Sequence, residues 1–109
     1  MIRQTRHARE QADALLDHYL QNDYEQAYEK LVDAIAEAVA LIEANPTGGA
    51  TYPRPYPSIA AFGFRWIKVH RYWFGWSLIR GYPVLTNVFF DTAFIEGRIQ
   101  PDESDDLPI

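Results

Sequence analysis

The sequence contains no cysteine, and this absence excludes several kinds of chemistry. Without a thiol, the chain has no disulfide framework, no cysteine-ligated zinc site and no cysteine nucleophile. No apolar run approaches the roughly 20 residues that a membrane-spanning helix needs, and the N-terminus has no apolar core typical of a signal peptide. We therefore expect a cytoplasmic protein with no membrane partner and no cofactor.

Acidic residues are missing from one long stretch, residues 44–90. The basic residues of this stretch are Arg54, Arg65, Lys68, Arg71 and Arg80. Residues 1–43 hold four basic and nine acidic residues, and residues 91–109 hold one basic and six acidic residues. The net negative charge of the whole chain therefore conceals a cationic segment, residues 44–90. Two interpretations stay open: a contact surface for an acidic partner, either nucleic acid or an acidic peptide, or basic side chains on the solvated face of a sheet.

The first part of the chain predicts two helices. Apolar side chains at helical spacing indicate a helix from about Arg6 to Gln21. Asp23, followed by Gln26, resembles a capping box that starts a second helix. Asn45-Pro46 ends this helix, because the residue before proline avoids the helical region and proline lacks the backbone N–H. A break this short predicts an antiparallel helix hairpin.

The second part predicts a sheet. Residues 45–58 contain four prolines and two glycines and are expected to form a surface connection. Three runs rich in aromatic and β-branched residues follow, from Phe62 to Val69, Tyr72 to Ile79 and Val84 to Phe90. Short breaks between them predict a three-stranded antiparallel meander.

We thus expect a single α+β domain over residues 1–96, in which an N-terminal antiparallel helix hairpin packs on a small antiparallel sheet. Residues 2–6 would supply an optional short N-terminal strand. Residues 97–109 form an acidic tail that is either a solvated terminus or a segment that folds over the cationic sheet.

The run from Gly63 to Trp76 resembles the RelE/ParE superfamily of toxins from type II toxin–antitoxin modules. Members typically read Gly, apolar, Arg, about three residues, Val, Gly, Arg-Tyr and then an aromatic pair. The matching residues here are Arg65, Val69, Arg71, Tyr72 and Trp76. The Asn45-Pro46 stop and the spacing of Ala27, Leu31 and Ile35 also resemble the family, and the likeness extends over about residues 2–92.

The resemblance implies a small bacterial toxin that is neutralised by a cognate antitoxin in a hetero-oligomer. Two activities are known in the superfamily: RelE-like members cut mRNA on the ribosome, and ParE-like members poison DNA gyrase. An inactive relative that keeps only antitoxin binding is a third alternative.

The ribonuclease alternative would use Arg65, Lys68 and Arg71 as catalytic cations. Cleavage of RNA without a metal also needs a base and an acid. The segment from Asn87 to Phe94 lacks the basic residues that family members often carry there, and Asp91 would repel a phosphate. The gyrase alternative needs only a binding surface, so we favour a ParE-like toxin that is not an enzyme. Direct contact with nucleic acid is expected only in the ribonuclease alternative.

Several residues are assigned to partners on this basis. Residues predicted to bind the target are Arg65, Lys68, Arg71, Trp73 and Arg80. Residues predicted to bind the antitoxin are Tyr28, Leu31, Trp66 and Trp76.

Strand alternation separates the aromatic residues of the middle run. It places Tyr72, Phe74 and Trp76 on the face toward the helices, and it places Trp73 on the other face, where we expect it to be exposed or to meet a partner. His70 is predicted to be a turn residue at the surface rather than a general base. His7 and His18 have no evident third ligand, so no metal site is expected.

Overall fold

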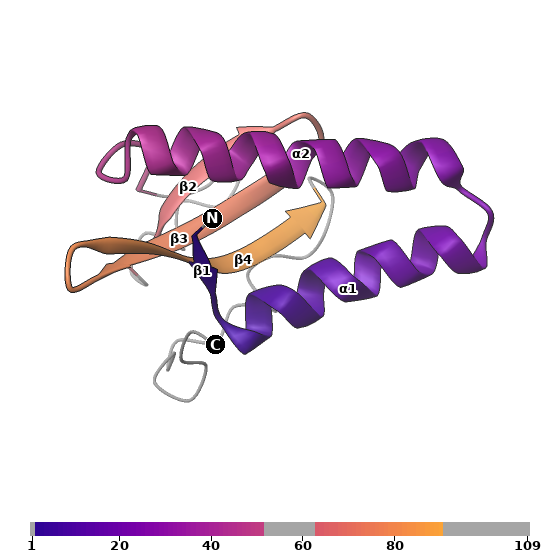
Figure 1. Ribbon diagram of the computed structural model, residues 1–109, viewed down its shortest axis with the longest axis horizontal. Helices are drawn as coiled ribbons and strands as arrows, with labels where there is room; N and C mark the ends of the chain where they lie inside the picture. The colour runs from indigo at the N-terminus through magenta and orange to yellow at the C-terminus, as the bar shows by residue number, and fades with distance from the viewer. Residues whose placement is uncertain (1, 52–62, 91–109) are drawn as a thin grey trace.

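The computed structural model describes residues 2–51 and 63–90, in which two helices lie on one face of a four-stranded sheet (Figure 1). In chain order the elements are β1 (Arg3–Gln4), α1 (Arg6–Gln21), α2 (Glu25–Ala44), β2 (Arg65–Val69), β3 (Tyr72–Ile79) and β4 (Tyr82–Phe90). The predicted α+β fold, with a helix hairpin ahead of the sheet, is confirmed. The predicted tail, the domain's last residues 91–96 and the second half of the proline-rich connection, residues 52–58, lie outside the described residues.

The first helix has the predicted bounds and a side-chain cap. The hydroxyl of Thr5 accepts a hydrogen bond from the backbone N–H of Ala8 at 3.1 Å, which satisfies one of the N–H groups that a helix start leaves unpaired. Ala8, Ala12 and Tyr19 are the buried residues of this helix. Their spacing puts them on a single stripe that faces the sheet.

The second helix ends as predicted but does not begin with the predicted capping box. Its N-cap is Tyr24, which makes no side-chain capping bond. Asp23 instead adopts a left-handed conformation with φ of 56°, so it belongs to the turn between the helices, where Asp is one of the residues that tolerate positive φ. The helix stops at Ala44, before Asn45 and Pro46.

The sheet has the strand order β1-β4-β3-β2. The three long strands form the predicted antiparallel meander. The short first strand exists but pairs parallel to β4, with Arg3 opposite Val84, so the complete sheet is mixed rather than wholly antiparallel. The last strand begins at Tyr82, two residues earlier than predicted, because only Arg80 and Gly81 separate it from β3.

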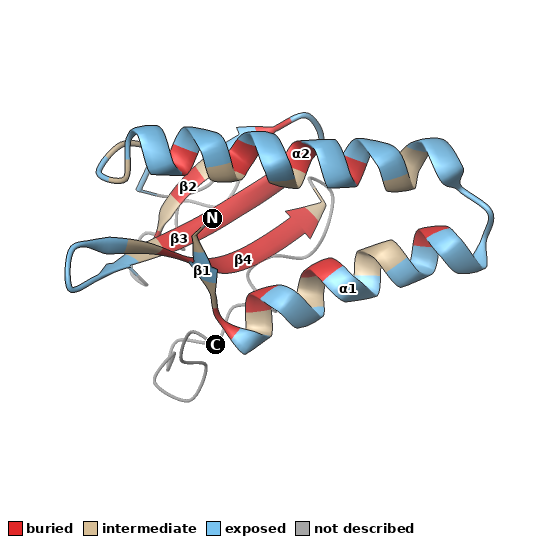
Figure 2. Ribbon diagram, viewed as in Figure 1, coloured by how far each residue is buried: buried red, intermediate tan, exposed pale blue. Residues whose placement is uncertain are grey.

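The middle of the sheet, in β3 and β4, is buried on both faces, whereas the helices expose their outer sides (Figure 2). Between the helices and the sheet, the helices contribute mainly small residues and the strands contribute large ones. Members of this core include Ala8, Ala12, Ala34, Ala38, Tyr72, Phe74, Trp76, Leu85 and Val88. None of the described helices is long and apolar enough to cross a membrane.

The face of the sheet away from the helices carries a second aromatic group. Trp66 stacks on Phe89 with ring centroids 6.3 Å apart, and a Cβ added to Gly75 would lie 2.9 Å from the Trp66 ring. Trp73 is on this face, as predicted, but it is only 8% exposed, so the expectation of an exposed Trp73 is wrong. The reason is that large aromatic side chains pack on one another on this face, as Trp66 does on Phe89.

Candidate functional site

The predicted target-binding cations do not share one surface. Arg65 begins β2 opposite Trp76, whose side chain belongs to the helix-facing core. Its Nη1 atom donates hydrogen bonds to the carbonyl oxygens of Thr47 and Gly48. Trp76 acts in the same region, because its Nε1 atom donates to the carbonyl oxygen of Pro46 at 2.9 Å. Both side chains therefore hold the segment that follows α2 against the sheet.

Lys68 lies on the opposite face, where its Nζ atom is 5.9 Å from the centroid of the Trp73 ring. Arg71 lies in the turn between β2 and β3 and places its guanidinium carbon 5.1 Å from the centroid of the Phe90 ring. Such distances are typical of cation–π contacts. Arg80 lies in the other turn, at the far end of β3.

The separation of these cations limits what they can do together. Arg65 and Arg71 lie near opposite ends of β2, and the four residue-to-residue steps from Arg65 to Val69 correspond to about 13 Å. Lys68 alternates to the other face. The three residues proposed for the ribonuclease alternative therefore do not converge on one phosphate.

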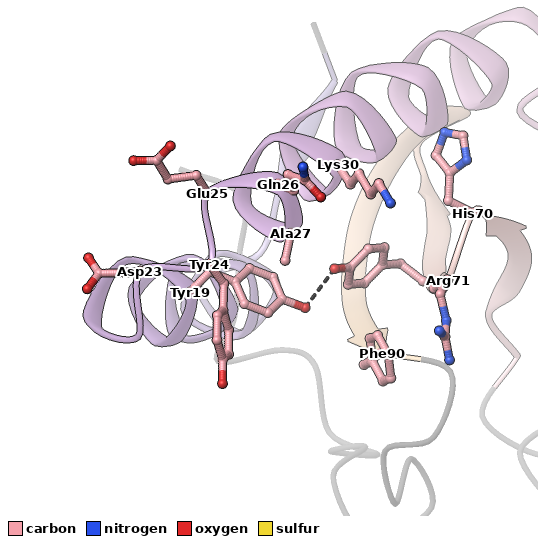
Figure 3. Close-up of a pocket in the computed structure, with 11 residues that line it drawn as sticks. Tyr19, Asp23, Tyr24, Glu25, Gln26, Ala27, Lys30, His70, Arg71 and Phe90 are labelled. Carbon is pink, nitrogen blue, oxygen red and sulfur yellow. Dashed lines mark hydrogen bonds between the residues drawn. The ribbon is translucent and has the colours of Figure 1, made fainter.

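A cavity of about 570 Å³ forms where the start of α2, the end of α1 and the β2–β3 turn meet. Figure 3 shows the side chains that line it. Its basic lining residues are Lys30, His70 and Arg71, and its acidic ones are Asp23 and Glu25. In the close-up, Lys30 extends toward the sheet, whereas Asp23 and Glu25 point away from that wall. The cavity thus has a basic side at the sheet and an acidic side at the helix junction.

Two tyrosine hydroxyls meet in the wall of this cavity. Tyr19 of α1 and Tyr72 of β3 are hydrogen-bonded at 2.7 Å, and both residues are buried. Either oxygen can be the donor. The pair joins the helical layer to the sheet with one buried polar contact, and burial makes the loss of such a contact costly.

His70 closes the basic side of the cavity and has the surface position that we predicted. Its side chain is 55% exposed, and its Nε2 atom lies 2.9 Å from a carboxylate oxygen of Glu37. The backbone at His70 is left-handed, with φ of 56°. The contact links the β2–β3 turn to α2, and its exposure means that it contributes little to stability.

The chemistry available in this cavity is cationic and hydroxylic. A lysine ammonium group, an arginine, a histidine and a tyrosine pair are groups that bind an anion or transfer a proton. Over residues 2–51 and 63–90, no group of three or more His, Asp or Glu residues could hold a metal ion.

The residues assigned to the antitoxin divide into two classes. Tyr28 is half-buried at the surface of α2. Leu31, Trp66 and Trp76 are each no more than 1% exposed, so their assignment as contact residues is corrected: they fill the interior of the domain. Trp66 and Trp76 also face opposite sides of the sheet.

Sequence reasoning missed two features. The first is the Tyr19–Tyr72 pair: a buried tyrosine hydroxyl usually requires a partner, and that requirement points to a second buried polar group such as Tyr72. The second feature is a group of exposed apolar side chains around Arg80, formed by Leu78, Ile79 and Tyr82. Leu78 and Ile79 lie in the run from Tyr72 to Ile79, for which the sequence predicts a strand but no exposed apolar group.

Comparison with known proteins adds no assignment. No protein-family model matches the chain, no curated protein matches it, and no solved structure matches it.

Proposed function

We propose that this chain is the toxin of a bacterial type II toxin–antitoxin module, of the RelE/ParE kind, and that it acts in the cytoplasm. In this proposal a cognate antitoxin neutralises the chain, and the free chain inhibits DNA gyrase by binding it. The proposal rests on the sequence resemblance described above. The fold agrees with the expected order of a helix hairpin followed by an antiparallel meander.

The positive charge of the exposed sheet residues is the observation that supports a binding function. Lys68, Arg71 and Arg80 are exposed, and residues 63–90 contain no acidic residue. These cations lie apart from one another, at two turns and on one strand. Such a distribution suits contact with an extended acidic surface, whereas catalysis at one phosphate requires groups that converge.

The antitoxin would bind elsewhere in this proposal. Both helices expose acidic residues on their outer sides, among them Asp13, Asp17, Glu29, Asp33 and Glu37. A basic antitoxin segment would complement that surface, and Tyr28 offers an aromatic contact beside it.

A second candidate, the ribosome-dependent ribonuclease, is favoured by the cavity of Figure 3. There Lys30, His70 and Arg71 accompany the Tyr19–Tyr72 pair, so a cation and proton-transferring groups share one site. We rank it second because Arg65 is held by backbone carbonyls and Lys68 lies on the other face of the sheet. An inactive relative that retains antitoxin binding remains the third candidate.

Pulse-labelling of DNA and protein synthesis tests the proposal. The chain is induced in bacteria without its antitoxin, and both rates are followed over the first minutes. We expect DNA synthesis to fall while protein synthesis continues. An early fall of protein synthesis would favour the ribonuclease, and continuation of both would contradict toxin activity.

A further inference from the structure

The tip of the β3–β4 hairpin exposes three apolar side chains close together in the chain. Leu78 is 37% exposed, Ile79 is 40% exposed and Tyr82 is 74% exposed. These three are within five consecutive residues, and Ile79 and Tyr82 form the pair that closes the turn. In Figures 1 and 2 the hairpin projects past the end of α2 as a narrow, mostly exposed finger. An apolar group of this kind on a projecting element is typical of an interaction site.

The first residue of this turn, Arg80, is not the residue type that stability alone would favour at that position. Arg80 has φ of 54° and Gly81 has φ of 84°, as a two-residue type I′ turn requires. Asn, Asp or Gly usually occupies the first position, because a long side chain with positive φ is unfavourable. Within residues 2–51 and 63–90, the side chain of Arg80 makes no hydrogen bond or ion pair.

The charge of the finger indicates what it would meet. Arg80 is its only charged residue, and no acidic residue lies anywhere in residues 63–90. Tyrosine and arginine are the residue types that most often dominate binding energy at protein interfaces. An apolar finger with one cation at its tip is complementary to an apolar cleft that has a carboxylate within reach.

We infer that this finger, formed by Leu78, Ile79, Arg80 and Tyr82, is the element by which the chain docks into its protein target. The inference rests on the proposed function, in which that target is DNA gyrase. The partner surface is thus an apolar-lined cleft of that target protein, with a carboxylate within reach of Arg80.

The position of the finger keeps it apart from the surface proposed for the antitoxin. Tyr28 lies in the first turns of α2, next to the helix junction, whereas the finger projects past the other end of the same helix (Figure 1). The two partners would therefore contact different ends of the molecule. A finger variant should lose the target and keep the antitoxin.

The test measures binding of the purified full chain to purified DNA gyrase with DNA. Two variants alter the finger, Tyr82→Ser and Arg80→Asn. Leu41→Ser is the matched control, because Leu41 is an apolar residue of α2 with 44% exposure. Thermal melting of every variant reports whether the fold is intact.

We expect each finger variant to bind at least about tenfold more weakly than the unaltered chain, as for a central interface residue. We expect Leu41→Ser to bind within about twofold. Because Asn suits a type I′ turn better than Arg, Arg80→Asn should melt at the same temperature or higher.

Two results would overturn the inference, and they are distinguishable. If the unaltered chain binds gyrase and the finger variants bind equally well, the finger is not the docking element, although the proposed function survives. If the unaltered chain does not bind gyrase, the proposed target fails and the inference fails with it.

Discussion

The helical layer and the sheet layer of this molecule differ in both charge and side-chain size. The helices carry most of the acidic residues that the structure describes, and they approach the core through alanines such as Ala34 and Ala38. The sheet carries four basic residues and no acidic one between residues 63 and 90, and it fills the core with Phe74 and Trp76. The sheet therefore supplies most of the packed volume, while the two layers offer surfaces of opposite charge.

This difference bears on stability and on recognition. Small residues on the helices let the backbone approach the sheet closely, so the aromatic residues can be covered by only two helices. Opposite surface charges give one small domain two surfaces of different chemistry, each complementary to a different kind of charged surface.

The largest effect is expected in the core of the sheet layer. Phe74 is fully buried beneath the helices, so Phe74→Ala should lower the free energy of unfolding by about 3–5 kcal/mol. Urea denaturation followed by circular dichroism measures this change. A loss under about 1 kcal/mol would mean that the sheet does not supply the main packing.

The second effect concerns the bond between the layers. Tyr19→Phe removes one partner of the 2.7 Å hydroxyl pair and should cost about 1–2 kcal/mol of unfolding free energy. A double-mutant cycle with Tyr72→Phe isolates the pair, and we expect a coupling of about 1 kcal/mol. Strict additivity would show that the two hydroxyls do not support each other.

The third effect belongs to the helical layer alone. Thr5→Ala removes the cap of α1 and should destabilise the protein by about 1 kcal/mol. Asp23→Asn is the control, since Asp23 caps nothing in the described structure and Asn also tolerates a left-handed backbone. Equal losses for both variants in thermal melting would contradict the assignment of the caps.

The smallest effect is expected at the exposed link between the layers. His70 and Glu37 are both more than half exposed, so Glu37→Gln should change the unfolding free energy by less than about 0.5 kcal/mol. The same denaturation experiment measures it. A loss above about 1 kcal/mol would indicate a stronger role for this contact than its exposure allows.

The sequence predicted the helices and the meander well because their signals are local. Helical spacing fixed α1 from Arg6 to Gln21, and Pro46 fixed the end of α2. The start of α2 was misplaced because Asp23 fits both a capping box and a left-handed turn, and only the path between the helices separates these roles. The parallel pairing of Arg3 with Val84 joins residues far apart in the chain, which no local pattern contains.

The site was less predictable for a physical reason. Which face of a strand is covered depends on the whole fold and not on the local sequence. Trp66 and Trp76 were therefore predicted as contact residues, although both are interior. Arg65 read as a binding cation, yet its guanidinium holds the backbone after α2. Lys30 and Tyr19 line the cavity because the helices fold back over the sheet, and no local sequence pattern contains that arrangement.

The central claim, that the sheet layer contacts the target, is tested most directly by charge reversal in cells. Chains with Lys68→Glu and Arg80→Glu are compared with chains carrying Arg6→Glu and Arg9→Glu, which reverse two exposed cations of α1. Each chain is induced without antitoxin, and the rate of DNA synthesis is followed by pulse-labelling. We predict that the unaltered chain and the α1 variant halt DNA synthesis, whereas the sheet variant leaves it running. A sheet variant that halts DNA synthesis as fast as the unaltered chain would contradict the claim.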